Sequence, residues 1–133
     1  LEIGTGTGYS AAVMSRLAGR VVTLDRYRAL VEHARTRYDQ LGITNVTVRQ
    51  ADGTNGLAAE GPFDRIVVWT AFDSHPRMFL DQLSSGGVMM APIGPAEDKQ
   101  VLARLTKVGS RFDREDIGEV RFQPFIKGIA SKL

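Results

Sequence analysis

The sequence contains no cysteine, and its 133 residues include only two histidines and one tryptophan. The missing thiols exclude disulfides, thiolate metal sites and a cysteine nucleophile, and we expect no metal site. The formal net charge is only +2, so the composition makes no electrostatic case for nucleic-acid binding. The longest apolar runs, residues 66–69 and 88–93, are far shorter than the roughly 20 residues that cross a bilayer, and we expect no membrane partner.

Length and composition indicate one ordinary hydrophobic core. With 43% hydrophobic residues, the chain can bury a core of its own, and we expect residues 1–133 to form a single domain. The chain starts at Leu1 rather than at a methionine, and Leu1 already lies in a segment expected to be a central strand. We therefore expect the natural protein to have a further segment upstream.

Residues 1–9 are the most informative part of the chain, because a strand end runs into alternate glycines and then into a helical pattern. Glycine suits such a turn because it adopts positive φ and lets a ligand approach main-chain amides without a Cβ in the way. A dinucleotide fingerprint would place its third glycine where Tyr9 stands, so the spacing argues against NAD. The observed pattern of Gly4, Gly6 and Gly8 is common in S-adenosylmethionine-dependent methyltransferases, and a tight structural turn is its plain alternative.

The rest of the chain alternates short strands with helices. Helical spacing of apolar residues predicts helices near residues 11–17 (ended by Gly19), near 30–41 (ended by Gly42) and after Pro76, with Met78, Phe79 and Leu83 facing inward. Strands are expected at residues 21–24, 45–49, 63–69, 88–92 (after a Gly86-Gly87 turn), 101–107 and 119–122, the last two joined through Gly109 and a charged segment. This order predicts an α/β fold with a Rossmann-like, doubly wound and mostly parallel sheet.

Residues at the carboxyl ends of the strands are the first site candidates, because ligands of such sheets lie beyond those ends. Asp25 ends the second strand and can accept two hydrogen bonds from a ribose diol; a capping or surface carboxylate is the alternative. Asp52 ends the third and can accept from an exocyclic amine while Gly53 admits an adenine ring, unless the pair only forms a turn. Glu2 either braces the glycine loop or reaches a ligand's ammonium group.

Thr70 and Ala71 follow the fourth strand, where the reactive end of the ligand is expected. They are our candidates for the catalytic positions. Of the two histidines, His33 lies among arginines on a helix and is expected to be solvated. His75 stands near the active edge, where ordinary loop or capping duty is a simpler interpretation than substrate contact.

Several segments together resemble the protein-L-isoaspartate (D-aspartate) O-methyltransferase family. They cover nearly the whole chain, in the order and spacing of that family: Leu1 to Tyr9 with Ala11-Ala12-Val13, Val22 to Arg26, Asn45 to Val48, Asp52 to Gly56, Pro62 to Val68, Gln82-Leu83 with Gly86-Gly87, Pro92-Ile93-Gly94, and Val120 to Pro124. Glutamate is more usual in the family where this chain has Asp25.

The resemblance implies a class I methyltransferase fold with S-adenosylmethionine as the cofactor. It implies methyl transfer to the α-carboxylate of L-isoaspartyl residues in damaged proteins or peptides, as protein repair. Because a carboxylate is already ionised at neutral pH, with an intrinsic pKa near ~4, the reaction needs no general base. The expected cofactor-binding residues are Glu2, Gly4, Thr5, Gly6, Gly8, Tyr9, Asp25, Arg26, Asp52 and Gly53.

The chain departs from the family after the fourth strand. There Phe72 and Asp73 replace small residues and are expected to narrow the acceptor pocket and to place a negative charge beside a negatively charged substrate. The family's amino-terminal segment, with a serine that helps to hold the substrate carboxylate, has no counterpart in these residues. The alternatives left open are a methyltransferase with a small-molecule acceptor and a non-catalytic cofactor-binding module. We expect a monomeric, cytoplasmic protein.

Overall fold

The computed structural model describes residues 1–133, and its contacts divide the chain into two compact units. The first unit comprises Leu1–Gly53 and Lys127–Leu133, and the second comprises Thr54–Ile126. Whether they act as the single expected domain stays a prediction. The elements are β1 (Glu2–Ile3), α1 (Tyr9–Met14), β2 (Val21–Asp25), α2 (Arg28–Gln40), β3 (Val46–Gln50), three 3₁₀ turns (Gly53–Asn55, Ala58–Glu60, Arg77–Gln82), β4 (Phe63–Val68), β5 (Leu83–Ile93), β6 (Gln100–Val108) and β7 (Arg111–Val120).

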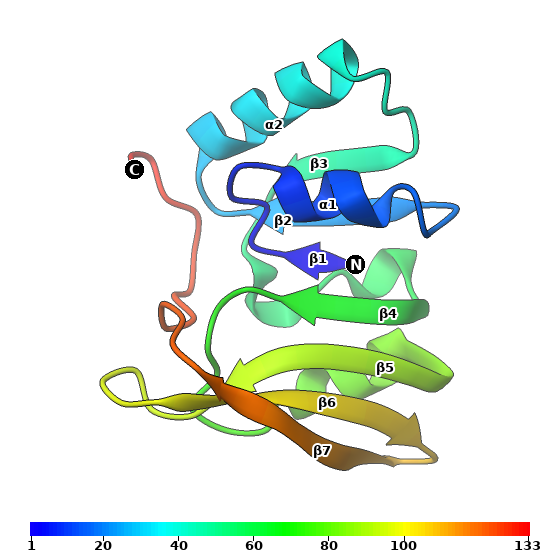
Figure 1. The fold of residues 1–133 in the computed structure, drawn as a ribbon, viewed down its shortest axis with the longest axis vertical. Helices are drawn as coiled ribbons and strands as arrows, with labels where there is room; N and C mark the ends of the chain where they lie inside the picture. Colours follow the sequence, from blue (N-terminus) through cyan, green and yellow to red (C-terminus); the bar gives the residue numbers. More distant parts are fainter. The chain divides into compact units, whose positions relative to one another are not determined.

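The strands of the first unit are all parallel, in the order β3-β2-β1 (Figure 1). All five residues of β2 are buried, as expected for a strand with a neighbour on either side and both faces covered. The register pairs Asp25 with Gln50, so β2 and β3 end side by side. The predicted strands of this unit are therefore confirmed, and their carboxyl ends share one edge.

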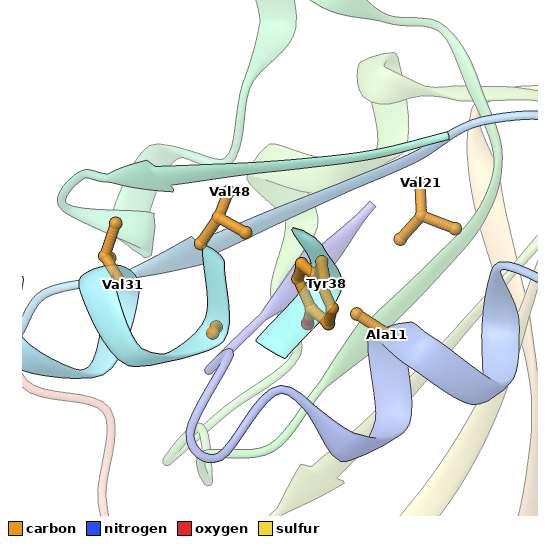
Figure 2. Close-up of a cluster of buried hydrophobic side chains, with 6 residues drawn as sticks. Ala11, Val21, Val31, Tyr38 and Val48 are labelled. Carbon is orange, nitrogen blue, oxygen red and sulfur yellow. The ribbon is translucent and has the colours of Figure 1, made fainter. Parts of the chain in front are cut away.

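Both helices of the first unit pack on the same apolar cluster (Figure 2). Ala11 of α1 meets Ala34 and Tyr38 of α2 there, and the strands supply Val21 and Val48. Small residues at positions 11 and 34 let the two helices come close. This cluster fixes α1 and α2 against β2 and β3.

The first helix is shorter than expected, since α1 ends at Met14 and Leu17 is 84% exposed. The prediction of a helical face that includes Leu17 was wrong. The Ser15 hydroxyl donates to Ala12 O (2.6 Å), and the Asn45 amide donates to the carbonyls of Ser15 and Ala18. These side chains satisfy carbonyl groups that a longer helix would have used, and so end the helix early.

The second unit contains β4 and β5 in parallel, followed by β6 and β7 in antiparallel order. The expected turn at Gly86-Gly87 was wrong: both glycines lie within β5, at a register irregularity opposite Phe63 and Arg65, where Gly86 has φ +71°. An irregularity of this kind accommodates extra residues in one strand without ending it.

The last strand lies earlier than expected. The charged segment 111–119 forms most of β7, and residues 121–122 lie outside it. Nearly every side chain of β7 is exposed, as suits a charged edge strand that resists pairing with another chain. Because only one neighbour covers this strand, its sequence lacks the apolar pattern on which the prediction depended.

The segment after Pro76 is a 3₁₀ turn rather than an α-helix. Phe79 and Gln82 are buried, and so is Leu83, but Met78 is 50% exposed, so the inward placement of Met78 was wrong. Three residues per turn place positions 79 and 82 on one face and position 78 on another.

Candidate functional site

The glycine loop of the first unit has the conformation that its spacing predicts. Gly4, Gly6 and Gly8 have φ values of +96°, +53° and +85°, which side chains with a Cβ rarely adopt. The N–H groups of Gly4 and Thr5 both donate to Leu24 O, at 2.8 and 3.1 Å. The loop is thus attached to the end of β2, and α1 begins directly after it at Tyr9, with Gly8 as the N-cap residue.

Asp25 holds the same loop from the end of β2. Its Oδ2 accepts from Gly6 N (2.9 Å), and its Oδ1 accepts from Tyr27 N (3.0 Å). The carboxylate is 7% exposed, and two backbone donors stabilise it against this burial. Each carboxylate oxygen can accept more than one hydrogen bond, so Asp25 retains capacity for ligand hydroxyls.

Glu2 is fully buried and belongs to a chain of side-chain hydrogen bonds. The Thr23 hydroxyl donates to Glu2 Oε2 (2.5 Å), and the Ser10 hydroxyl donates to Glu2 Oε1. Since the single proton of Thr23 is directed at Glu2, the Thr5 hydroxyl must donate to Thr23 Oγ1 (2.7 Å). These contacts join Thr5 of the glycine loop and Ser10 of α1 to β1 and β2, and they favour the bracing interpretation of Glu2.

Helix α2 holds the loop from its other side. The Tyr38 hydroxyl donates to Gly8 O (2.9 Å), and Arg37 Nη1 donates to Thr7 O (2.5 Å). Burial raises the pKa of Tyr38 to about 12, and the negative charge of Glu2 adds to the rise. A Cβ on Gly8 would lie 2.9 Å from Tyr38 Oη, so only glycine fits at this approach.

The other expected cofactor residues also lie in the first unit. Asp52 Oδ2 accepts from Gly128 N (2.8 Å), and Gly53 is buried at the start of a 3₁₀ turn. The Arg26 guanidinium lies over the Tyr27 ring at 5.4 Å, and its Nε is buried without a hydrogen-bond partner. Tyr9 is 75% exposed at the first position of α1. The ligand roles of all these residues stay predictions.

Thr70 and Ala71, the expected catalytic positions, lie in the second unit. Ala71 N donates to Gln123 O (2.8 Å) and Ala71 O accepts from Phe125 N (2.9 Å), so residues 123–125 run alongside this loop. Thr70 Oγ1 is buried and has no hydrogen-bond partner in the structure. A buried hydroxyl without a partner is energetically unfavourable, and such groups are often explained by a ligand or an ordered water.

Phe72 is buried among other aromatic residues of the second unit. Its ring is 8% exposed and packs on Phe125 (centroids 4.8 Å apart) and edge-on to Phe79 (5.9 Å). It therefore anchors the loop inside the second unit, while Asp73 is exposed. That Phe72 and Asp73 narrow an acceptor pocket stays a prediction. Arg114 Nη1 donates a hydrogen bond to His75 Nε2 (2.9 Å), which favours a structural role of His75 in the loop. His33 is exposed as expected.

Several buried polar residues were not predicted from the sequence. Thr23 and Tyr38 are buried polar groups bonded to the loop or to its brace, and Gln100 in the second unit is completely buried. Gln100 Oε1 accepts from Phe122 N (2.6 Å), and its amide donates to the carbonyls of Pro95 and Phe122 (both 3.2 Å). Of these residues, only Thr23 could have been suspected from the sequence, because it is a polar residue within the apolar run 21–24.

Comparisons with known proteins agree with the resemblance. A family model described as Protein-L-isoaspartate(D-aspartate) O-methyltransferase (PCMT) matches residues 1–130. The chain is 48% identical over 133 residues to a Protein-L-isoaspartate O-methyltransferase of Rhizobium meliloti (strain 1021), and this match covers 100% of the chain and 65% of that relative. A solved structure named protein-L-isoaspartate O-methyltransferase is 35% identical, with a TM-score of 0.84 over 92% of this chain and 40% of that chain.

A more distant structure, from Plasmodium falciparum in complex with S-adenosyl-L-homocysteine, is 23% identical, with a TM-score of 0.78 over 95% of this chain and 64% of that chain. This likeness shows the fold alone. Together the structural matches confirm the predicted Rossmann-like α/β methyltransferase fold. The chain spans 61% to 65% of the length of the first curated relatives. None of its helices has the length and apolar character that crossing a membrane requires.

Proposed function

Because the chain belongs to the protein-L-isoaspartate(D-aspartate) O-methyltransferase family, we propose that the protein methylates the α-carboxylate of L-isoaspartyl residues in damaged proteins or peptides. S-adenosylmethionine is the methyl donor in this proposal. Isoaspartyl-containing proteins or peptides are therefore its partners.

The observation that supports the cofactor most directly is the glycine loop with Asp25. Three glycines with positive φ present backbone with no Cβ, and Asp25 stands beside them with its carboxylate oriented by two N–H groups. These features suit a nucleoside with a ribose diol and a charged amino-acid tail. We assign the ribose to Asp25 and the adenine to Asp52 and Gly53.

When bound, S-adenosylmethionine supplies a methyl group activated by a positively charged sulfur. The acceptor carboxylate is ionised at neutral pH, so the protein needs no base to create the nucleophile. Its task is to orient the two reactants and to keep them in line. For that task Thr70 offers a buried hydroxyl with no hydrogen-bond partner, which we assign to the acceptor carboxylate.

The decisive test is methyl transfer by the full-length protein from labelled S-adenosylmethionine to two peptides that differ in one linkage. The first carries an isoaspartyl bond and the second carries an aspartyl bond at the same position. Label in the isoaspartyl peptide alone supports the proposal. Label in neither peptide, with cofactor binding intact, refutes it in favour of a small-molecule acceptor or a non-catalytic role.

The assignment of Thr70 has its own test, which separates catalysis from folding. Thr70→Val keeps the shape of the side chain and removes a buried hydroxyl that has no partner. We expect Tm to stay the same or rise, because an unsatisfied buried polar group is unfavourable by about 1–3 kcal/mol. We expect kcat/KM for the isoaspartyl peptide to fall by roughly tenfold, the effect of one lost hydrogen bond to a charged group. Unchanged kcat/KM would exclude substrate contact by Thr70.

A cytoplasmic location and a monomeric state also stay predictions. Cell fractionation tests the first, and sedimentation of the full-length protein tests the second.

A further inference from the structure

The segment Lys127–Leu133 returns to the first unit and contacts the residues expected to bind adenosine. Gly128 N donates to Asp52 Oδ2 (2.8 Å) across 76 positions of sequence. Ala130 N donates to Arg26 O (3.0 Å), and Ala130 forms a parallel bridge with Tyr27. Figure 1 draws this segment in red beside the turn that leads from β2 into α2.

These contacts reach both expected anchors of the nucleoside. Tyr27 N is one of the two donors that orient Asp25, and the segment pairs with Tyr27 itself. The Gln50 amide donates to Arg26 O (3.2 Å) and to Ala130 O (3.5 Å), which ties the end of β3 to the same segment. One short piece of chain thus links the end of β2, the end of β3 and the carboxylate of Asp52.

Gly128 has φ +85°, and a Cβ added there would find open space. Its backbone conformation, rather than crowding, therefore requires glycine. An alanine at this position would strain the turn and displace its N–H without striking a neighbour. The substitution is accordingly a clean probe of the hydrogen bond to Asp52.

We propose that the backbone N–H of Gly128 is a positioning group for the cofactor site. It orients the Asp52 carboxylate so that this carboxylate accepts from the exocyclic amine of adenine. The inference rests on the proposed function, because it takes the ligand to be an adenosine derivative. It adds that selectivity for adenine depends on a segment far from the glycine motif in sequence.

The test compares two ligands of the full-length protein by calorimetric titration. S-adenosylhomocysteine carries the exocyclic amine, and S-inosylhomocysteine carries an oxygen in its place. We expect Gly128→Ala to weaken the binding of S-adenosylhomocysteine about tenfold, because the Asp52 carboxylate would no longer be oriented towards the exocyclic amine. The affinity for S-inosylhomocysteine should change little, because that ligand lacks the amine. The ratio of the two affinities should therefore shrink towards one.

Gly42→Ala is the matched control, because Gly42 has φ +64°, open space for a Cβ and a place in the same unit at the end of α2. It should leave the ratio unchanged. Gly128→Asn should restore most of the selectivity, since asparagine tolerates positive φ and keeps the N–H. Ala130→Pro removes the donor to Arg26 O and should lower the ratio in the same direction, which keeps the test open if Gly128→Ala fails to fold.

Asp52→Ala supplies the last comparison. In that background Gly128→Ala should have no further effect on the ratio, because the two changes act through one interaction. An equal loss for both ligands in Gly128→Ala would make the segment merely structural and overturn the inference. A wild-type protein that binds neither ligand would instead overturn the proposed function, so the two failures are distinguishable.

Discussion

Alanine at Gly8 is expected to destabilise the full-length protein far more than alanine at Gly6, although both glycines belong to one loop. Both have positive φ, +53° for Gly6 and +85° for Gly8, and an L-residue in such a conformation is unfavourable by about 1–2 kcal/mol. For Gly6 this is the whole effect, because a Cβ there has no neighbour within 4 Å.

At Gly8 the new Cβ would also lie 2.9 Å from Tyr38 Oη and 3.1 Å from Ala34 Cβ. Tyr38 would have to move, which breaks its hydrogen bond to Gly8 O (2.9 Å) and disturbs the cluster between α1 and α2. Overpacking and a lost buried hydrogen bond together add about 2–3 kcal/mol. We therefore expect about 1–2 kcal/mol for Gly6→Ala and about 3–5 kcal/mol for Gly8→Ala.

Urea unfolding followed by circular dichroism measures both values, provided that the m-value stays constant. Tyr38→Phe supplies the internal control, because it removes the oxygen that the new Cβ would strike. In that background the effect of Gly8→Ala should fall by about 1 kcal/mol or more, as expected for residues in contact. Equal effects at Gly6 and Gly8, or no coupling to Tyr38, would refute the packing argument.

Three further results are expected of the full-length protein. Asp25→Ala should weaken binding of S-adenosylhomocysteine at least tenfold, since it removes the proposed ribose acceptor and a charged partner of two backbone donors; unchanged affinity in a titration would exclude that role. The pKa of Tyr38 is raised to about 12, so the neutral side chain makes its full contribution to the free energy of unfolding below about pH 10. That contribution is lost as the pH rises towards 12 and Tyr38 ionises, and the free energy of unfolding should fall by about 2 kcal/mol. Tyr38→Phe should abolish this part of the pH dependence of unfolding. Gln100→Leu leaves Phe122 N without its acceptor and should lower stability by about 2–3 kcal/mol in urea, whereas the exposed Gln123→Leu should change it by less than about 0.5 kcal/mol.

The glycine loop, the strands β2 and β3 and the helix α2 could all be predicted, because each depends on neighbours within a few residues. Alternate glycines predict a tight turn, and the apolar spacing from Leu30 to Leu41 predicts α2. Asp25 became a site candidate by its place at a strand end. The structure adds that its carboxylate accepts from Gly6 N, which makes it part of the loop that it was expected to accompany.

Where the prediction was wrong, an element owed its form to its neighbours in space. β7 is a charged strand only because β6 pairs with it, and Met78 is exposed because the chain there makes a 3₁₀ turn. The stacking of Phe72 on Phe125, more than 50 positions away in the second unit, could not be predicted for the same reason.

The sequence by itself determined the kind of ligand loop, the order of the strands along the chain and the carboxylates at their ends, since local spacing and backbone freedom specify these. Only the tertiary structure decided which groups hold those residues in place. Three of these contacts are hydrogen bonds between residues far apart in the sequence: Tyr38 donates to Gly8, Thr23 to Glu2 and Gly128 to Asp52. The physical reason is that a buried polar group needs a hydrogen-bond partner, and the tertiary fold decides which residue lies close enough to be that partner. The local sequence around the group does not specify that residue.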